Sequence, residues 1–330
     1  MPPGSPLPLI SIVAPVFNEA ASLPELVRRI AETVRSLQER YAFEILLVDD
    51  GSTDGSLEVA KTLVAGESRL RIIELRRNFG QTAALQAGLD AANGDILISM
   101  DSDLQHFPED IPQLVAKLEE GYDLVCGWRH DRKEGVLRRW PSRAANLVIR
   151  RISHLDVQDF GTTFRAYRAD LIRHMRLLGE QHRFVPALAE MVGARITEVK
   201  IRNIERPFGE SSYGLGRTLG VLLDITFLFF SIRYLNRPLR AFGTIAMLLA
   251  LLGVSIAAWL LGYSFLTGVA TVREHSGWFI LAAFLLLSSL QLMLVGILAE
   301  VLVRIYYRLG GSEAYVIRRE WKATEAERVR

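Results

Sequence analysis

Two long apolar stretches in the last third of the chain limit its fold more than any other feature. Residues 239–261 carry one charge, Arg240 near the start, and residues 278–303 carry only Glu300 near the end. A helix of about 23–26 residues is ~35–39 Å long, which is enough to cross a hydrocarbon core about 30 Å thick. Two buried core helices are the alternative, but both stretches lack an amphipathic stripe. The sequence therefore predicts two transmembrane helices.

The charges beside these stretches predict their orientation. In the connection 262–277, Arg273 is offset by Glu274. The outer flanks are rich in arginine: Arg233, Arg237, Arg304, Arg308, Arg318 and Arg319. Because positive residues stay on the cytoplasmic side, we expect a multi-pass protein of the cell (inner) membrane with both ends in the cytoplasm. The start of the chain lacks the basic and apolar regions of a signal peptide, which also favours a cytoplasmic soluble part.

The remaining sequence divides around these spans. Residues 218–232 are apolar but short and interrupted by Asp224, so we expect an amphipathic helix lying in the membrane interface over 213–237. A re-entrant or third span is the alternative. The expected parts are a soluble domain over 1–212, this interfacial region, a helical hairpin over 238–303 and a cytoplasmic tail over 304–330. The tail contains a short strand, 314–320, that is available to pair with a neighbouring chain.

The soluble part alternates between strand and helix patterns. Strands are expected at 10–16, 43–48, 70–75, 95–100 and 122–126. Helices are expected at about 24–40, after the turn at 51–56, and at 81–92 and 108–121. Near-continuous apolar strands that alternate with helices predict an α/β fold with a doubly wound, mostly parallel sheet. The first strand is not followed by a Gly-x-Gly-x-x-Gly motif, and a P-loop motif is also missing, so neither a dinucleotide cofactor nor P-loop chemistry is favoured.

Acidic residues follow two of these strands. Asp101 and Asp103 come after the fourth strand, with Gln105 close behind, and Asp49 and Asp50 end the second. Two close carboxylates are costly to keep ionised unless a cation lies between them, and oxygen ligands favour Mg²⁺ or Mn²⁺ shared with substrate phosphates. Ligands bind at the carboxyl ends of such strands, so the pattern predicts a site for a nucleoside diphosphate. Capping of the following helix is the alternative for Asp50.

Three separated motifs resemble those of family 2 glycosyltransferases, which have the Rossmann-like GT-A fold. They are VAPVFNE at 13–19, VDDGSTDG at 48–55 and DSDLQHFPE at 101–109. Within that family the chain is most similar to the dolichol-phosphate mannose synthases and to their bacterial relatives. Those relatives transfer glucose or formamido-arabinose from UDP-sugars to undecaprenyl phosphate. The resemblance covers essentially the whole chain, including the paired spans.

The resemblance implies roles for individual residues. Asp159 stands where bacterial relatives have a proposed catalytic base, and Asp103 joins it as a catalytic residue. The implied nucleotide-binding residues are Pro15, Phe17, Glu19, Asp50, Asp101 and Ser102. The implied metal ligands are Asp101, Asp103 and the side-chain oxygen of Gln105. The implied phosphate and acceptor contacts are Arg129, Ser142, Arg143 and Arg206, while Ser212 stands where some relatives have a lysine.

The expected reaction is an inverting, metal-dependent transfer of a sugar from a nucleotide-sugar donor, with UDP favoured over GDP, to a polyisoprenyl-phosphate lipid. A phosphate monoester has a second pKa near ~6, so the acceptor is already largely ionised and needs no strong base. Asp159 is therefore either a base or a group that orients an arginine, Arg165 or one that binds phosphate. His106 is a further possible metal ligand, but a diphosphate site favours oxygen ligands.

Two other functions remain open at this stage. A processive polysaccharide synthase would carry a Gln-x-x-Arg-Trp segment, which residues 181–184 (QHRF) do not reproduce. A non-catalytic nucleotide-binding scaffold is the second alternative, although the intact Asp101 and Asp103 pair argues against it. Nucleic-acid binding is not expected, because it would leave the two spans unexplained. The resemblance also implies a homo-oligomer, as relatives form tetramers.

Overall fold

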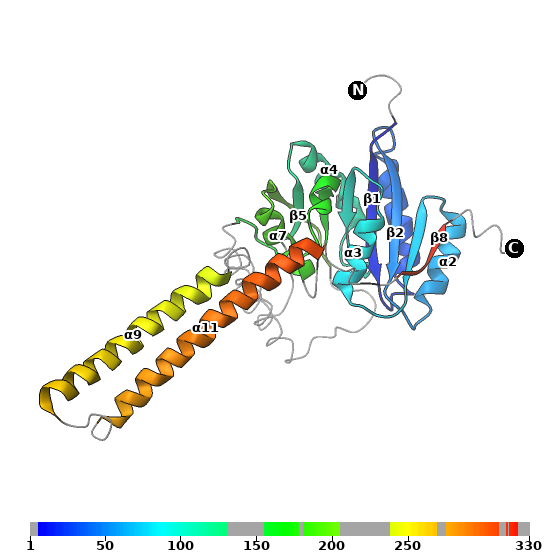
Figure 1. The fold of residues 1–330 in the computed structure, drawn as a ribbon. Helices are drawn as coiled ribbons and strands as arrows, with labels where there is room; N and C mark the ends of the chain where they lie inside the picture. Colours follow the sequence, from blue (N-terminus) through cyan, green and yellow to red (C-terminus); the bar gives the residue numbers. More distant parts are fainter. Residues whose placement is uncertain are drawn as a thin grey trace. The chain divides into compact units, whose positions relative to one another are not determined.

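The computed structural model describes residues 6–130, 155–177, 181–204, 238–268, 275–309, 315 and 317–322. They belong to two compact units, one made of the described residues up to 204 together with 315–322, and the other of 238–309. Figure 1 shows a layered α/β unit and a hairpin of two long helices. Each unit is considered by itself below.

The first unit is organised around one sheet with the strand order β7-β5-β6-β4-β1-β2-β3-β8 among the described residues. Pairs within β4-β1-β2-β3 and between β5 and β7 are parallel, whereas β6 and β8 run antiparallel to their neighbours. The predicted mostly parallel α/β sheet is therefore confirmed. The strands are β1 (Leu9–Val16), β2 (Ala42–Asp49), β3 (Leu70–Leu75), β4 (Ile96–Ser99), β5 (Leu124–Arg129), β6 (Arg165–Arg168), β7 (Ile196–Ile201) and β8 (Ile317–Lys322).

Helices cover both faces of the sheet. Because side chains alternate along a strand, β1 contributes Ile10 and Ile12 to the core under α1, α2 and α4, and Val13 to the core under α3, α6 and α7. This double coverage explains why the parallel strands are apolar almost throughout. The helices are α1 (Leu23–Arg35), α2 (Ser56–Gly66), α3 (Gln81–Ala91), α4 (Ile111–Glu119), α6 (Ala169–Arg173) and α7 (Val185–Met191), with 3₁₀ turns at Pro108–Asp110 and Gln181–Phe184.

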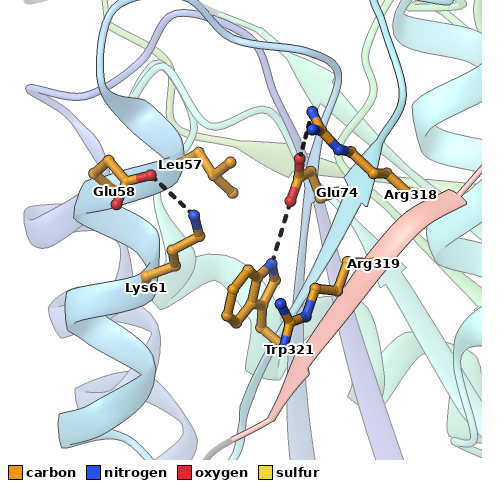
Figure 2. Close-up of a pocket in the computed structure, with 7 residues that line it drawn as sticks. All are labelled: Leu57, Glu58, Lys61, Glu74, Arg318, Arg319 and Trp321. Carbon is orange, nitrogen blue, oxygen red and sulfur yellow. Dashed lines mark hydrogen bonds and ion pairs between the residues drawn. The ribbon is translucent and has the colours of Figure 1, made fainter. Parts of the chain in front are cut away.

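The strand expected in the tail is present, but its position and partner differ from the expectation. It covers Ile317–Lys322 and pairs with β3 of the same chain. Glu320 accepts a hydrogen bond of 2.6 Å from the Arg71 guanidinium, which ties the end of the chain to the sheet. A shallow pocket lies at this edge, between α2, β3 and β8, where Figure 2 shows Trp321 between Lys61 and Arg319. None of the predicted site residues lines it.

The described residues of the second unit form two antiparallel helices, α9 (Pro238–Thr267) and α11 (Ser276–Leu309). Both predicted apolar stretches are therefore helical, and each helix exceeds its predicted bounds. The helices pack closely at Gly253, where an added Cβ would lie 2.9 Å from Leu286 Cγ. Both are long and apolar enough to cross a membrane, and only 17% of each most apolar window is buried. The expected interfacial helix over 213–237 lies outside the described residues.

Candidate active site

The carboxyl ends of β1, β2 and β4 meet at one edge of the sheet, because these strands are adjacent and parallel. The Ser102 hydroxyl, in the loop after β4, donates a hydrogen bond of 2.8 Å to the Pro15 carbonyl of β1. The Asp50 amide, just after β2, donates one of 2.9 Å to the Val16 carbonyl. The three predicted segments are thus brought together as the sequence indicated.

Side chains lock the loop after β1 onto the loop after β2. The Asn18 amide donates to Ser52 Oγ, and the Thr53 amide donates back to Asn18 Oδ1 at 2.8 Å. Asn18 has a φ of 56°, a left-handed conformation that asparagine tolerates better than most residues. Phe17, directly before it, leaves 45% of its surface exposed. An aromatic ring is therefore presented at the edge where the three loops meet.

Asp50 holds the next loop along the sheet. Its Oδ1 and Oδ2 accept hydrogen bonds from the amides of Phe79 (2.7 Å) and Gly80 (2.9 Å), which follow β3. Burial raises the pKa of Asp50 above its usual value. Gly51 makes the close approach possible, because an added Cβ would lie 2.7 Å from the backbone of Arg77. Asp50 thus connects the ends of β2 and β3.

The acidic loop after β4 contains the predicted metal ligands. The Asp101 side chain is 24% exposed, whereas Asp103 is buried and accepts the Gln105 amide on Oδ1 at 3.1 Å. Leu104, between Asp103 and Gln105, has a φ of 62°, an unusual conformation for leucine. Such strained residues persist only where surrounding contacts enforce them, and they occur often at functional sites. The backbone carbonyl of Gln105 in turn accepts a hydrogen bond of 3.2 Å from the backbone amide of Ile204.

The donor chemistry of this loop fits a hard cation. Its available ligands are oxygens from two carboxylates and one amide, and the described residues contain no cluster of three or more His, Cys, Asp and Glu suited to a metal. Mg²⁺ is commonly held by one or two carboxylates together with substrate phosphates, so two are sufficient. The His106 ring is buried and stacks on Phe164, with Nδ1 3.9 Å from Asp101 Oδ2. It is positioned as a neighbour of Asp101.

Asp159 is paired with the arginine at the end of β5. Its carboxylate accepts two hydrogen bonds from the Arg129 guanidinium, at 2.7 and 2.9 Å, and both side chains are largely buried. The idea that Asp159 orients Arg165 is wrong. Arg165 is completely buried and donates instead to the carbonyls of Phe160 and His182. The role of Asp159 as a base stays a prediction.

The other predicted contacts divide into described and undescribed residues. The backbone amide of Glu19 donates a hydrogen bond of 2.7 Å to Ser56 Oγ, which fixes Glu19 in the loop after β1. Ser142, Arg143 and Arg206 lie outside the described residues.

The sequence interpretation missed Gln81, the first residue of α3. Its side-chain amide donates a hydrogen bond of 2.8 Å to Asp101 Oδ1. The available signal was its place directly after the Gly80 turn, at the same sheet edge as the acidic loop.

The arrangement of the sheet and its helices is that of the GT-A fold. The fold is similar to the crystal structure of mannosyl-3-phosphoglycerate synthase from Rubrobacter xylanophilus (TM-score 0.52, 16% identity, 68% of this chain and 74% of that chain). It is also similar to glucosyl-3-phosphoglycerate synthase from Mycobacterium tuberculosis (TM-score 0.50, 21% identity, 68% and 80%). At these identities the similarity concerns the fold alone.

Sequence comparison gives the family. Residues 11–176 match the family described as glycosyl transferase family 2. The chain is 42% identical over 314 residues to dodecaprenyl-phosphate galacturonate synthase of Rhizobium johnstonii, covering 94% of this chain and 92% of that one. It is 37% identical over 320 residues to undecaprenyl-phosphate 4-deoxy-4-formamido-L-arabinose transferase of Pseudomonas paraeruginosa, covering 96% and 92%. The chain therefore belongs to glycosyltransferase family 2, as its motifs indicated.

Proposed function

We propose that this protein transfers a sugar, with inversion, from a nucleotide-diphosphate sugar to polyisoprenyl phosphate at the cytoplasmic face of a membrane. The observation that carries the proposal is one chain that combines the acidic loop after β4 with two apolar helices long enough to cross a bilayer. Relatives that match over more than nine-tenths of the chain are named as polyprenyl-phosphate sugar transferases. The bacterial-type resemblance favours a UDP-sugar donor and undecaprenyl phosphate as the acceptor.

The donor's nucleotide is proposed to bind across the β1, β2 and β4 ends. The exposed Phe17 ring offers a face on which a base stacks, and Glu19 and Asp50 offer carboxylates to the nucleoside. The hydrogen bond from Ser102 to the Pro15 carbonyl fixes the backbone beside this site.

Asp101, Asp103 and Gln105 are proposed to hold Mg²⁺ or Mn²⁺ together with the diphosphate. The bound cation would stabilise the negative charge that develops on the leaving nucleoside diphosphate. The protein's contribution is to hold these oxygens in position before the donor binds, so that little reorganisation is required during the reaction.

The acceptor phosphate is proposed to attack the anomeric carbon from the side opposite the leaving group. Its second pKa is near ~6, so it supplies its own nucleophilic oxygen at neutral pH. Arg129 is suited to a phosphate contact because Asp159 fixes its guanidinium with two hydrogen bonds. The pairing supports an orienting role for Asp159. Ser142, Arg143 and Arg206 are further proposed phosphate contacts.

The hairpin is proposed to cross the membrane twice, with both chain ends in the cytoplasm. Its outward apolar side chains support burial in lipid, since side chains such as Leu287 and Leu298 are 57% and 60% exposed. Aromatic and histidine rings gather where α9 and α11 approach their connection: Trp259, Tyr263, His275 and Trp278. Tryptophan and tyrosine are enriched at membrane interfaces, which supports placing that end of the hairpin at an interface.

The direct test is a panel of UDP- and GDP-sugars offered to the purified full chain in detergent with undecaprenyl phosphate and Mg²⁺ or Mn²⁺. One donor is expected to give a lipid-linked monosaccharide and free nucleoside diphosphate, with the product's anomeric configuration opposite to the donor's. The matched control is Asp103→Asn, which is expected to form the product about 10²–10³-fold more slowly. No lipid-linked sugar from any donor would overturn the proposal, and a polymeric product would favour a processive synthase.

A further inference from the structure

We propose that Gln81 is a positioning residue that fixes the cation-binding carboxylate of Asp101; this inference rests on the proposed metal-dependent transfer. The Gln81 side-chain Nε2 donates a hydrogen bond of 2.8 Å to Asp101 Oδ1. The contact joins the start of α3 to the loop after β4, 20 residues apart in sequence. It directly links the residues that follow the β3 loop to the acidic loop.

The backbone that carries Gln81 is itself held in place. Gly80, the preceding residue, has a φ of 96° and a ψ of 157°, a conformation that only glycine adopts readily. Its amide and that of Phe79 donate to the two oxygens of Asp50. Gln81 therefore follows a turn whose backbone is fixed. Its side chain continues the series of hydrogen bonds that runs from the end of β2, through the loop after β3, to the loop after β4.

The hydrogen bond restricts one oxygen of Asp101 and thereby the plane of the carboxylate. Oδ2, the other oxygen, lies on the side of His106, whose Nδ1 is 3.9 Å away. An amide donor suits this task because it is uncharged: it orients the carboxylate without the repulsion that a lysine or arginine would exert on a cation. Partners that orient a metal ligand in this way typically change metal affinity or activity about 10–100-fold when removed.

The location of Gln81 separates this role from a purely structural one. The side chain is exposed at the first position of a helix, so its removal leaves the buried core of α3 unchanged. Methionine has the same unbranched length but lacks the donor, so Gln81→Met removes the hydrogen bond with little change in shape. Gln113, an exposed glutamine on α4 whose Nε2 donates to the Lys200 carbonyl at 3.3 Å, gives the matched control, Gln113→Met.

The test measures Mn²⁺ binding to the full chain in detergent by electron paramagnetic resonance, with UDP present. Gln81→Met is expected to raise the Kd for Mn²⁺ about 10-fold or more, and Gln113→Met less than about 2-fold. In turnover assays Gln81→Met should raise the Mn²⁺ concentration for half-maximal rate by a similar factor, while kcat at saturating Mn²⁺ and the KM for the acceptor stay close to wild type. Thermal unfolding of both variants should match wild type.

Other outcomes distinguish the two proposals. Equal Mn²⁺ affinity of Gln81→Met and wild type would overturn the role of Gln81 while leaving the metal site intact. Weaker UDP binding by Gln81→Met without metal would also overturn it, because the side chain would then contact the nucleotide directly. If wild type binds no more Mn²⁺ than Asp103→Asn does, the metal site of the proposed function fails instead.

Discussion

The two units of this protein use the same apolar residue types in opposite ways. In the α/β unit, side chains such as Ile12, Val13 and Leu46 are fully buried between the sheet and its helices. In the hairpin, α9 and α11 bury little beyond the line where they touch, and Leu261 and Phe265 are 73% and 89% exposed. Composition alone does not tell these situations apart; the period of the pattern and the length of the run do.

The difference also separates the tasks of the two units. The polar side chains of the candidate site in the α/β unit lie at one edge of the sheet, where the strands end and the backbone leaves regular structure. The described helices of the hairpin carry few charged side chains: residues 239–261 contain only Arg240 and residues 278–303 contain only Glu300. Chemistry is therefore expected to depend on the first unit and location on the second, and the following experiments test that division.

The largest effect is expected from Asp103→Asn. Asparagine can still accept the Gln105 amide through its side-chain oxygen, so the loop should keep its conformation. Loss of one carboxylate from the cation site is expected to lower the transfer rate about 10²–10³-fold, measured as lipid-linked product formed per minute. The fraction of protein that resists alkaline extraction from membranes should stay unchanged. Full activity of this variant would show that the metal ligands are misassigned.

A charge introduced into the hairpin should instead weaken the attachment of the protein to the membrane. Leu287 is 57% exposed and lies near the middle of the second apolar helix, whereas Leu7 of the α/β unit is 46% exposed. If the hairpin lies in lipid, Leu287→Arg costs about 2.5–3.5 kcal/mol of insertion free energy, while Leu7→Arg faces water and costs within about 0.5 kcal/mol. Alkaline extraction should release more of the first variant only. Equal retention of both would contradict the transmembrane assignment.

Much of the fold could be predicted because its signals are local. The five expected strands, including 70–75 and 122–126, match β1 to β5 to within a few residues, since an apolar run bounded by turn residues identifies a buried parallel strand. β6 was missed because Arg165–Arg168 contains two arginines in four residues, and the burial of Arg165 depends on carbonyls that only the folded chain supplies. β7 was missed as well, because Ile196–Ile201 is not a continuous apolar run and alternates between apolar and polar residues only from Glu198 onwards.

The site shows the same limit. Residues that follow strands, such as Asp101 and Asp50, could be grouped from the sequence because parallel strands end at a common edge. For Asp159, an arginine that binds phosphate was one of the alternatives that the sequence left open. The choice of Arg129 as its partner, and the hydrogen bond of Gln81 to Asp101 itself, join segments whose spacing is set by packing. The placement of β6 between β4 and β5 is a similar case, since nothing local specifies the neighbour of a strand.

Replacing closely packed glycines is expected to have smaller effects, and their size should differ between the two units. A Cβ at Gly88 would lie 2.3 Å from Val13 Cγ1 and 2.9 Å from Val48 Cγ2, between α3 and the sheet, whereas one at Gly253 would lie 2.9 Å from Leu286 Cγ. We expect Gly88→Ala to lower the free energy of unfolding by about 1–3 kcal/mol. Gly253→Ala should cost less, because two helices can separate slightly and a leucine can change rotamer.

The measurement is denaturant unfolding, followed by circular dichroism for Gly88→Ala and in mixed micelles for Gly253→Ala. Gly66→Ala is the control, since a Cβ there meets nothing within 4 Å and alanine favours helix. An equal or larger loss at Gly253 would mean that the hairpin is packed as tightly as the α/β core.

The smallest effects are expected from pH, and they should come from the α/β unit. Burial raises the pKa of Asp49, which is 3% exposed, and nearby Glu74 adds to this. A raised pKa in the folded state means that the folded protein binds the proton more tightly than the unfolded chain does. The stability it contributes is complete below the unfolded pKa of about 3.9 and is lost as pH rises through the folded pKa. Asp49→Asn should therefore gain stability relative to wild type between pH 4 and pH 7.

Glu44 gives the opposite sign within the same unit. Burial acts to raise its pKa, but hydrogen bonds from Ser11, Asn93 and Arg71 outweigh burial and lower it. Its contribution is present above the unfolded pKa and is lost as pH falls through the folded one, so Glu44→Gln should lose stability relative to wild type at pH 7 and less at low pH. Urea midpoints at several pH values measure both variants. Parallel curves for the two would contradict these shifts, because opposite displacements of the pKa require the two differences from wild type to diverge as pH rises.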